Sequence, residues 1–184
     1  MNARTNATWW TGWRLTGVLL AAGGVYAVML TVTLPALTAR SGGLAMFDLS
    51  PLGYDAAYAH TVLERLGSEG RQYYLFRQLP LDAAYPALLA LSLAGIWRFL
   101  LRWSNMETAG RCALAWCAVA VAGLDYAENI AVAAMLLRFP WEGEALVGLA
   151  SATTVAKSMT ATVCFVGVIG LAVAATVRRI ALRR

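Results

Sequence analysis

Charge is what this sequence has least of. Aspartate, glutamate, lysine and arginine together make up 14% of the 184 residues, whereas apolar residues make up 60%. A water-soluble domain of this size needs more charged side chains to cover its surface. The mean hydropathy of +0.61 leads to the same conclusion. The scarcity of charge therefore argues against a soluble protein and favours one that is surrounded largely by lipid.

Side chains that commonly hold metals or carry redox chemistry are also scarce. His60 is the only histidine, which argues against a bis-histidine haem site and against a multi-histidine metal site. The three cysteines form no Cys-x-x-Cys pair, so a thiol–disulfide relay has no support, and buried cysteines usually behave as small apolar residues. We therefore expect no metal and no cofactor. The cysteines are Cys112, Cys117 and Cys164.

Long apolar runs are what the sequence does contain. A helix needs about 20 apolar residues to cross the hydrocarbon core of a bilayer. Four segments reach this length, at residues 15–37, 79–101, 112–137 and 146–177. The first is longer than the core of a secretion signal and has no convincing cleavage site after it, so we expect it to remain as a span. The prediction is an all-α integral membrane protein, with residues 1–184 as a single membrane domain.

The connections between the predicted spans are short, with one exception. Short loops make successive helices neighbours, so we expect a four-transmembrane-helix antiparallel bundle. The exception is the external segment 38–78, which contains a short amphipathic helix that ends at Gly67 and either lies on the membrane surface or caps the bundle. A second short helix from Ser68 is expected to lead into the next span, with interruptions near Pro80 and Pro86. The apolar stripe of the amphipathic helix is Ala59, Val62, Leu63 and Leu66.

Basic residues are distributed unevenly over the two sides of the predicted bundle. One side holds nine arginines and a single acid, and the other holds five arginines and seven acids. Because the positive side of a membrane protein faces the cytoplasm, we expect both termini there, in the cell (inner) membrane. The excess of arginine over lysine indicates a bacterial genome. The net charge of +5 then indicates anionic lipid at the inner leaflet as partner, not nucleic acid. The nine arginines are Arg4, Arg14, Arg98, Arg102, Arg111, Arg178, Arg179, Arg183 and Arg184, and the acid is Glu107.

Polar side chains interrupt the third predicted span close to its middle. Asp125, Glu128 and Asn129 stand at i, i+3 and i+4 and so share one helix face. An aspartate at the centre of a bilayer costs about 3 kcal/mol on insertion scales, so the two carboxylates must point into the bundle, be paired or be protonated. Asp125 and Glu128 are our candidates for a catalytic acid/base pair or an ion site. Tyr126 and Asn129 are candidates for orienting a substrate.

The fourth span contains Lys157, the only lysine of the chain. Lys157 could neutralise Asp125 or Glu128 across the helix interface; the alternative is that its amine reaches the outer surface. Asp82 begins the second span, where the simpler explanation is a favourable interaction with the helix dipole. The functional alternative is that Asp82 and Tyr85, with His60, line the mouth of a cavity leading to the acids. Lys157, Asp82 and Tyr85 are therefore further candidates for substrate binding.

Three functions fit these residues, and whether the protein is an enzyme stays open. The first is a membrane enzyme that acts on a lipid- or isoprenoid-like substrate through its intramembrane carboxylates. The second is a non-catalytic membrane subunit or scaffold, in which the polar residues form a structural core. The third is a proton- or cation-coupled carrier that acts as an oligomer. The partners expected are membrane lipids, a hydrophobic small molecule, and a second copy of the chain or another membrane protein.

Small residues recur at helical spacing in the fourth span, at Gly148, Ala152 and Ala156. Residues of this size at i, i+4 spacing allow two helices to approach closely. We expect them to pack within the bundle, with a dimer interface as the alternative.

Overall fold

A computed structural model describes residues 12–103 and 111–181, excepting the side chains of 111–115. Every regular element in these ranges is helical and none is a strand. Four helices are long and apolar enough to cross a membrane: Gly12–Arg40, Ala56–Trp103, Trp116–Arg138 and Glu144–Ala181. The expected all-helical fold with four long apolar helices is therefore confirmed. Of the residues used to orient the chain, Arg4, Glu107, Arg183 and Arg184 lie outside the described ranges.

The first long helix is built from three pieces. The α-helix α1 (Gly12–Val28) continues into a π-helical turn, η1 (Met29–Thr33), and then into α2 (Leu34–Arg40). Pro35, near the start of α2, has no N–H to donate and its ring crowds the carbonyl one turn earlier. A wider turn before the proline relieves this crowding, and such turns bend a helix and re-aim its side chains.

The second long helix repeats this arrangement. The helix α3 (Ala56–Tyr73) leads through a π-helical turn, η3 (Tyr74–Gln78), into α4 (Leu79–Trp103), and Pro80 again stands just after the turn. The interruption expected near Pro80 is thus present, whereas α4 continues through Pro86. The Thr33 hydroxyl of η1 donates a hydrogen bond to Oε1 of Gln78 in η3, so the last residues of the two turns meet.

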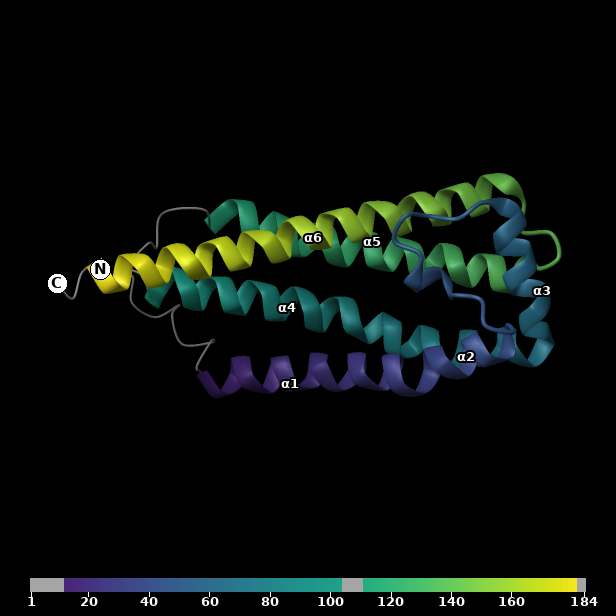
Figure 1. Ribbon diagram of the computed structural model, residues 1–184, viewed down its shortest axis with the longest axis horizontal. Helices are drawn as coiled ribbons and strands as arrows, with labels where there is room; N and C mark the ends of the chain where they lie inside the picture. Colours follow the sequence, from purple (N-terminus) through teal and green to yellow (C-terminus); the bar gives the residue numbers. More distant parts are fainter. Residues whose placement is uncertain (1–11, 104–110, 182–184) are drawn as a thin grey trace, which may run out of the picture.

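The amphipathic helix expected in the loop is the first part of α3. Asp55 caps its N-terminus by accepting a hydrogen bond from the Tyr58 N–H at 2.7 Å. Gly67, with φ of 63°, breaks the helix where the sequence predicts its end. Figure 1 shows α3 lying across one end of the long helices, so it caps them. The predicted stripe is confirmed, because its four members are all buried: Ala59, Val62, Leu63 and Leu66.

The remaining long helices are α5 (Arg111–Arg138) and α6 (Glu144–Ala181), which pack against α4 and against each other. Figure 1 shows α1 lying along α4, away from α5 and α6. A disulfide joins Cys117 of α5 to Cys164 of α6. Our expectation that the cysteines act only as small apolar residues was therefore wrong for these two. Spacing along the sequence did not reveal the bond because it depends on the register between two helices.

The small-residue prediction for α6 is also corrected. Gly148 and Ala152 are exposed, and the side of this helix that packs inward carries Val147, Ala150 and Thr154 instead. The contact of α6 with α5 is therefore made by other residues, among them Thr154, which donates a hydrogen bond to Glu128.

Candidate functional site: a buried acidic cluster around Lys157

Lys157 lies at the centre of the polar cluster. Its Nζ is 3.2 Å from Oδ1 of Asp125 and also forms an ion pair with Oε2 of Glu128. The Thr154 hydroxyl donates a 2.5 Å hydrogen bond to Oε1 of Glu128. The pairing works because Asp125 and Glu128 are three residues apart on α5, and Thr154 and Lys157 are three residues apart on α6. Lys157 therefore pairs with two carboxylates at once and does not reach the outer surface.

These charges are removed from solvent to different degrees. The side chain of Glu128 is fully buried, that of Asp125 is 4% exposed and that of Lys157 is 16% exposed. Moving charges out of water is costly unless each has partners, which is why removing a single member of such a group is usually severe. Glu128 is the most completely enclosed of the three and Lys157 the least.

A third carboxylate comes from the predicted external segment 38–78. Asp48 lies in a short 3-10 turn, η2 (Phe47–Leu49), and its Oδ2 accepts hydrogen bonds from the Tyr74 hydroxyl at 3.1 Å and from Gln78 Nε2 at 3.4 Å. Gln78 also accepts from Thr33, so a chain of polar contacts runs from η1 through η3 to Asp48. Sequence reasoning missed Asp48; the signal that would have pointed to it is a lone acid within an apolar stretch, residues 44–49.

Aromatic packing and one tight turn hold η2 in place. Phe47 is fully buried between the rings of Tyr54 and Tyr74, with ring centroids 4.8 and 6.2 Å away. After η2 the chain passes Gly53 and then Tyr54, whose N–H donates to the Ser151 hydroxyl of α6 at 2.9 Å. A Cβ at Gly53 would lie 2.7 Å from that hydroxyl oxygen, so only glycine permits this approach.

The environment of Asp48 favours its protonated form. Burial, with a smaller contribution from the Glu128 and Asp125 carboxylates, raises the pKa of the Asp48 carboxyl to about 6. The Lys157 ammonium and the hydrogen bond from Tyr74 act in the opposite direction but do not cancel the effect on this pKa. Asp48 can therefore exchange a proton close to neutral pH.

The fourth carboxylate is Asp82, which is 3% exposed. Asn129 of α5 donates from Nδ2 to the backbone oxygen of Asp82 at 3.0 Å and so fixes α4 against α5 at this point. Because α4 continues directly from η3, Asp82 does not stand at a free helix end, and the helix-dipole explanation was wrong. Within the described part of the chain, Oδ2 of Asp82 and Oδ1 of Asp48 are buried and have no hydrogen-bond partner.

A cavity of about 190 Å³ connects these groups. Its polar end is formed by Asp48, Asp82, Asp125 and Lys157. Tyr26 and Tyr85, whose rings stack at 5.3 Å between centroids, lie beside them. Apart from Ser158, the rest of the lining is apolar and includes residues of η1 and α6 that are partly exposed, such as Leu30 at 41% and Phe165 at 46%. The cavity is therefore amphiphilic: carboxyls and an amine line it beside apolar side chains, some of which lie near the surface of the molecule.

The other predicted candidates lie elsewhere. Tyr126 is 38% exposed and does not line the cavity, because the residue after Asp125 is turned by about 100° around the helix. His60 does not line its mouth either. The Nδ1 atom of His60 is 2.6 Å from a carboxylate oxygen of Glu142, and the two residues border a separate pocket with Pro140 and Gly143. Asp82 and Tyr85 do line the cavity, together with Asp125 and Lys157.

The chemistry open to this cluster is that of carboxyl groups and one amine. Among the described residues, no group of three or more histidine, cysteine, aspartate or glutamate side chains has the arrangement needed to hold a metal ion. Carboxyls in a water-poor site can donate or accept protons and can bind donors of hydrogen bonds.

Comparison of the chain with models of known protein families, with curated proteins and with solved structures finds no match. Function therefore has to be inferred from the site itself.

Proposed function

We propose that the protein is a multi-pass membrane protein whose four long helices cross the bilayer as antiparallel neighbours, with both termini in the cytoplasm. The distribution of arginine supports this orientation. The outer surfaces of the helices support the embedding. On α6 alone, apolar side chains are exposed from the middle of the helix to its end, where water would be an unfavourable solvent. These are Met159, Val163, Phe165, Val166, Ile169, Val173, Val177 and Ile180.

The function that the site supports best is binding of, and proton transfer to, a lipid- or isoprenoid-like molecule. The observation that carries this proposal is the amphiphilic cavity, with three carboxyls and Lys157 at its buried end and apolar side chains at the other. Its volume of about 190 Å³ accommodates the head and first part of a chain, and the remainder would extend into surrounding lipid. Entry would be sideways, between α1 and α6, where the half-exposed Tyr26 and Phe165 stand.

The unpaired carboxyl oxygens indicate which head group the bound molecule carries. Oδ2 of Asp82 and Oδ1 of Asp48 are buried acceptors without a protein donor, so they fit a hydroxyl or an amine on the bound molecule. Asp125, which borders the cavity while its Oδ1 is near Lys157, is the carboxyl best placed to exchange a proton with that molecule. Glu128 does not border the cavity, so its role is to hold Lys157 in position.

Binding is tested by identifying what is retained on purification. We expect mass spectrometry to detect an amphiphile with a hydroxyl or amine head on the purified wild type. Asp82→Asn, which replaces a carboxyl by an amide, and Ala161→Phe, which fills the apolar lining, should both reduce the retained amount several-fold. Glu64→Gln changes an exposed acid outside the cavity and should have no effect. Equal retention by all four proteins would overturn the proposed binding site.

Proton transfer is tested separately with the purified, loaded protein in D₂O. A proton that is removed from carbon and returned by a carboxyl exchanges with solvent, so deuterium should enter the bound molecule with wild type. The Asp125→Asn variant should lose this incorporation while it still retains the molecule. Binding without any deuterium uptake by wild type would show that the carboxyls do not act as acid and base.

One observation favours the structural alternative, a membrane subunit or scaffold with a polar core. Lys157, Asp125, Glu128 and Thr154 satisfy one another without any ligand. If this alternative holds, nothing is retained in the cavity, and Asp82→Asn and Ala161→Phe leave any partner protein bound.

A further inference from the structure

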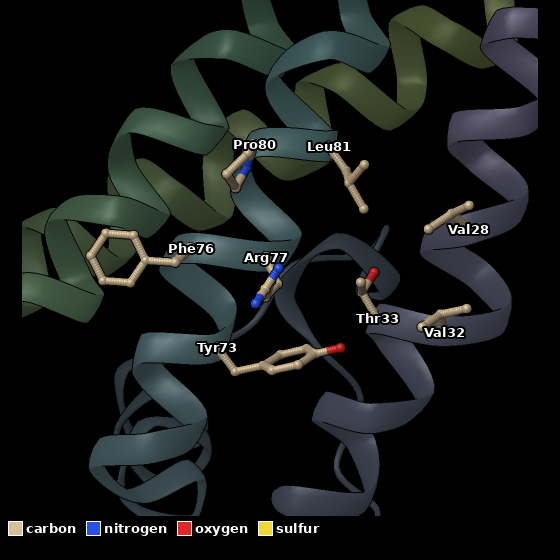
Figure 2. A pocket seen from close by; sticks show the side chains of 8 residues that line it. All are labelled: Val28, Val32, Thr33, Tyr73, Phe76, Arg77, Pro80 and Leu81. Carbon is tan, nitrogen blue, oxygen red and sulfur yellow. The ribbon is translucent and has the colours of Figure 1, made fainter.

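A second and larger cavity, of about 570 Å³, lies between the first and second long helices. It is a groove that borders another face of α1–η1 and shares no lining residue with the acidic cavity. Figure 2 shows Val28, Val32 and Thr33 facing Tyr73 and Arg77 across the gap, with Leu81 above them. Phe76, which is 69% exposed, points away from the gap.

The groove exists because two π-helical turns face each other. The turns η1 and η3 touch through the hydrogen bond between Thr33 and Gln78, and each is followed by a proline that bends its helix. The extra residue in each turn changes which side chains face the partner helix. Such turns occur often at functional sites.

The groove has a cationic end and an apolar end. Within the described part of the chain, the exposed guanidinium of Arg77 has no hydrogen bond or ion pair. Arg40 adds a second guanidinium at the same end, 4.4 Å from the ring centroid of Tyr73. Val28 and Leu81 lie further along their helices toward the middle of the bundle. A positive charge without a partner, next to an apolar channel, is complementary to an anion that carries a hydrocarbon chain.

We propose that this groove binds an anionic phospholipid, with the phosphate at Arg77 and an acyl chain along Val28, Val32 and Leu81. The order of the lining residues matches the order of parts in the lipid. Arg77, Tyr73, Thr33 and Val32 stand toward the loop end of the bundle, at the level of head groups in the proposed membrane, and Val28 and Leu81 follow toward its midplane. The guanidinium donates paired hydrogen bonds to phosphate oxygens.

The test is lipid selection by the purified full-length protein. Wild type, Arg77→Gln and Arg77→Lys are placed in nanodiscs of phosphatidylcholine with a minor share of phosphatidylglycerol. Lipids that remain bound after transfer to detergent are then counted by native mass spectrometry. Wild type should enrich phosphatidylglycerol about tenfold over its share, as expected for a charge-assisted contact. Arg77→Gln should lose the enrichment. Arg77→Lys should keep part of it, because lysine retains the positive charge but lacks the paired N–H donors of the guanidinium.

Two further variants separate the groove from general surface charge. Arg65→Gln removes an exposed arginine of α3 at the same end of the molecule and should leave the enrichment unchanged. Val32→Trp fills the apolar part of the groove, at a position where the side chain is already 53% exposed, and should reduce the enrichment of phosphatidylglycerol. Thermal unfolding checks that each variant is folded. Equal retention of the two lipids by wild type, or unchanged enrichment in folded Arg77→Gln, would overturn the proposal. Competition of inorganic phosphate against the lipid would show that phosphate alone is recognised, which also overturns it.

Discussion

Lys157 is the residue on which the cluster depends, because a single ammonium faces two carboxylates that are almost fully buried. Replacing it by methionine, which keeps the length of the side chain, leaves Asp125 and Glu128 without a counter-charge. We expect Lys157→Met to lower the free energy of unfolding by about 3–5 kcal/mol, as is usual when one partner of a buried ion pair is lost. Unfolding of the detergent-solubilised protein by heat or denaturant measures the effect.

The matched control neutralises the whole group. In the triple variant Lys157→Met, Asp125→Asn, Glu128→Gln, no charge is left unpaired, so most of the lost stability should return. A single Lys157→Met variant as stable as wild type would show that the carboxylates carry protons and need no ammonium beside them.

Asp48 makes the stability of the protein depend on pH. Its pKa is raised from 3.8 to about 6, so the folded protein holds this proton more tightly than the unfolded chain does. The resulting contribution to stability is complete below the lower pKa and is lost as the pH rises through the higher one. The melting temperature of wild type should therefore fall between about pH 4 and pH 7 relative to that of Asp48→Asn, whose side chain does not titrate. Parallel pH profiles of the two proteins would contradict this assignment.

The sequence predicted part of the cluster because part of it follows from helix periodicity. Spacing alone places Asp125, Glu128 and Asn129 on one face, but it left open whether Lys157 pairs with one of the acids or reaches the outer surface. Asp48 could not be found in this way, because its position depends on how a loop folds back between helices. Tyr126 was a candidate for orienting a substrate only because it follows Asp125 in the sequence. The next residue along a helix is turned by about 100°, so the Tyr126 side chain lies on a different face.

At the scale of elements, the position of η2 depends on the turn at Gly53. This residue has φ of 87° and its hydrogen faces the Ser151 hydroxyl, whereas Gly43 has φ of 94° with no atom close to a Cβ. Alanine at Gly43 should cost about 1–2 kcal/mol for its backbone conformation alone. Alanine at Gly53 carries the same cost plus about 1–3 kcal/mol from overpacking against α6. The difference between the unfolding free energies of the two variants gives the cost of the contact between a Cβ at position 53 and α6.

The same pair of variants tests whether η2 closes the acidic cavity. Gly53→Ala should shift η2 and Asp48 outward and so lower retention of the bound amphiphile, and Gly43→Ala should not. If both variants bind as wild type does, Asp48 is not part of the binding site.

Irregular helical turns mark the limit of what the sequence revealed about the elements. Pro80 predicted an interruption, which is present as η3, and Gly67 predicted a helix end, which is present as a break with positive φ. The π-helical form of η1 and η3 was not foreseen, because a proline shows where a helix is disturbed but not how the strain is relieved. The pairing of Cys117 with Cys164 was missed for a related reason: periodicity describes one helix, and a disulfide needs the register of two.

At the scale of the whole molecule, apolar residues lie on the surface of the long helices as well as in the core. Polar side chains such as Glu128, Gln78 and Thr154 are fully buried beside that core, while large apolar side chains are exposed along the long helices. In hydrocarbon this arrangement is favourable, because polar groups bind one another inside and apolar groups face the solvent. Composition predicted it, since too few charges are available to cover a surface of this size.

The proposed orientation is tested by the accessibility of introduced cysteines. In a Cys112→Ser background, Ser68→Cys places a thiol on the exposed side of α3 at the capped end of the bundle. Because arginines are concentrated at the opposite end, that cap should face outward, and a membrane-impermeant maleimide should label it in intact cells. Asn105→Cys, in the connection between the second and third spans, should react only after permeabilisation. Arginine near a helix end determines which end stays in the cytoplasm, so a reversed labelling pattern would mean that this bias does not orient the chain.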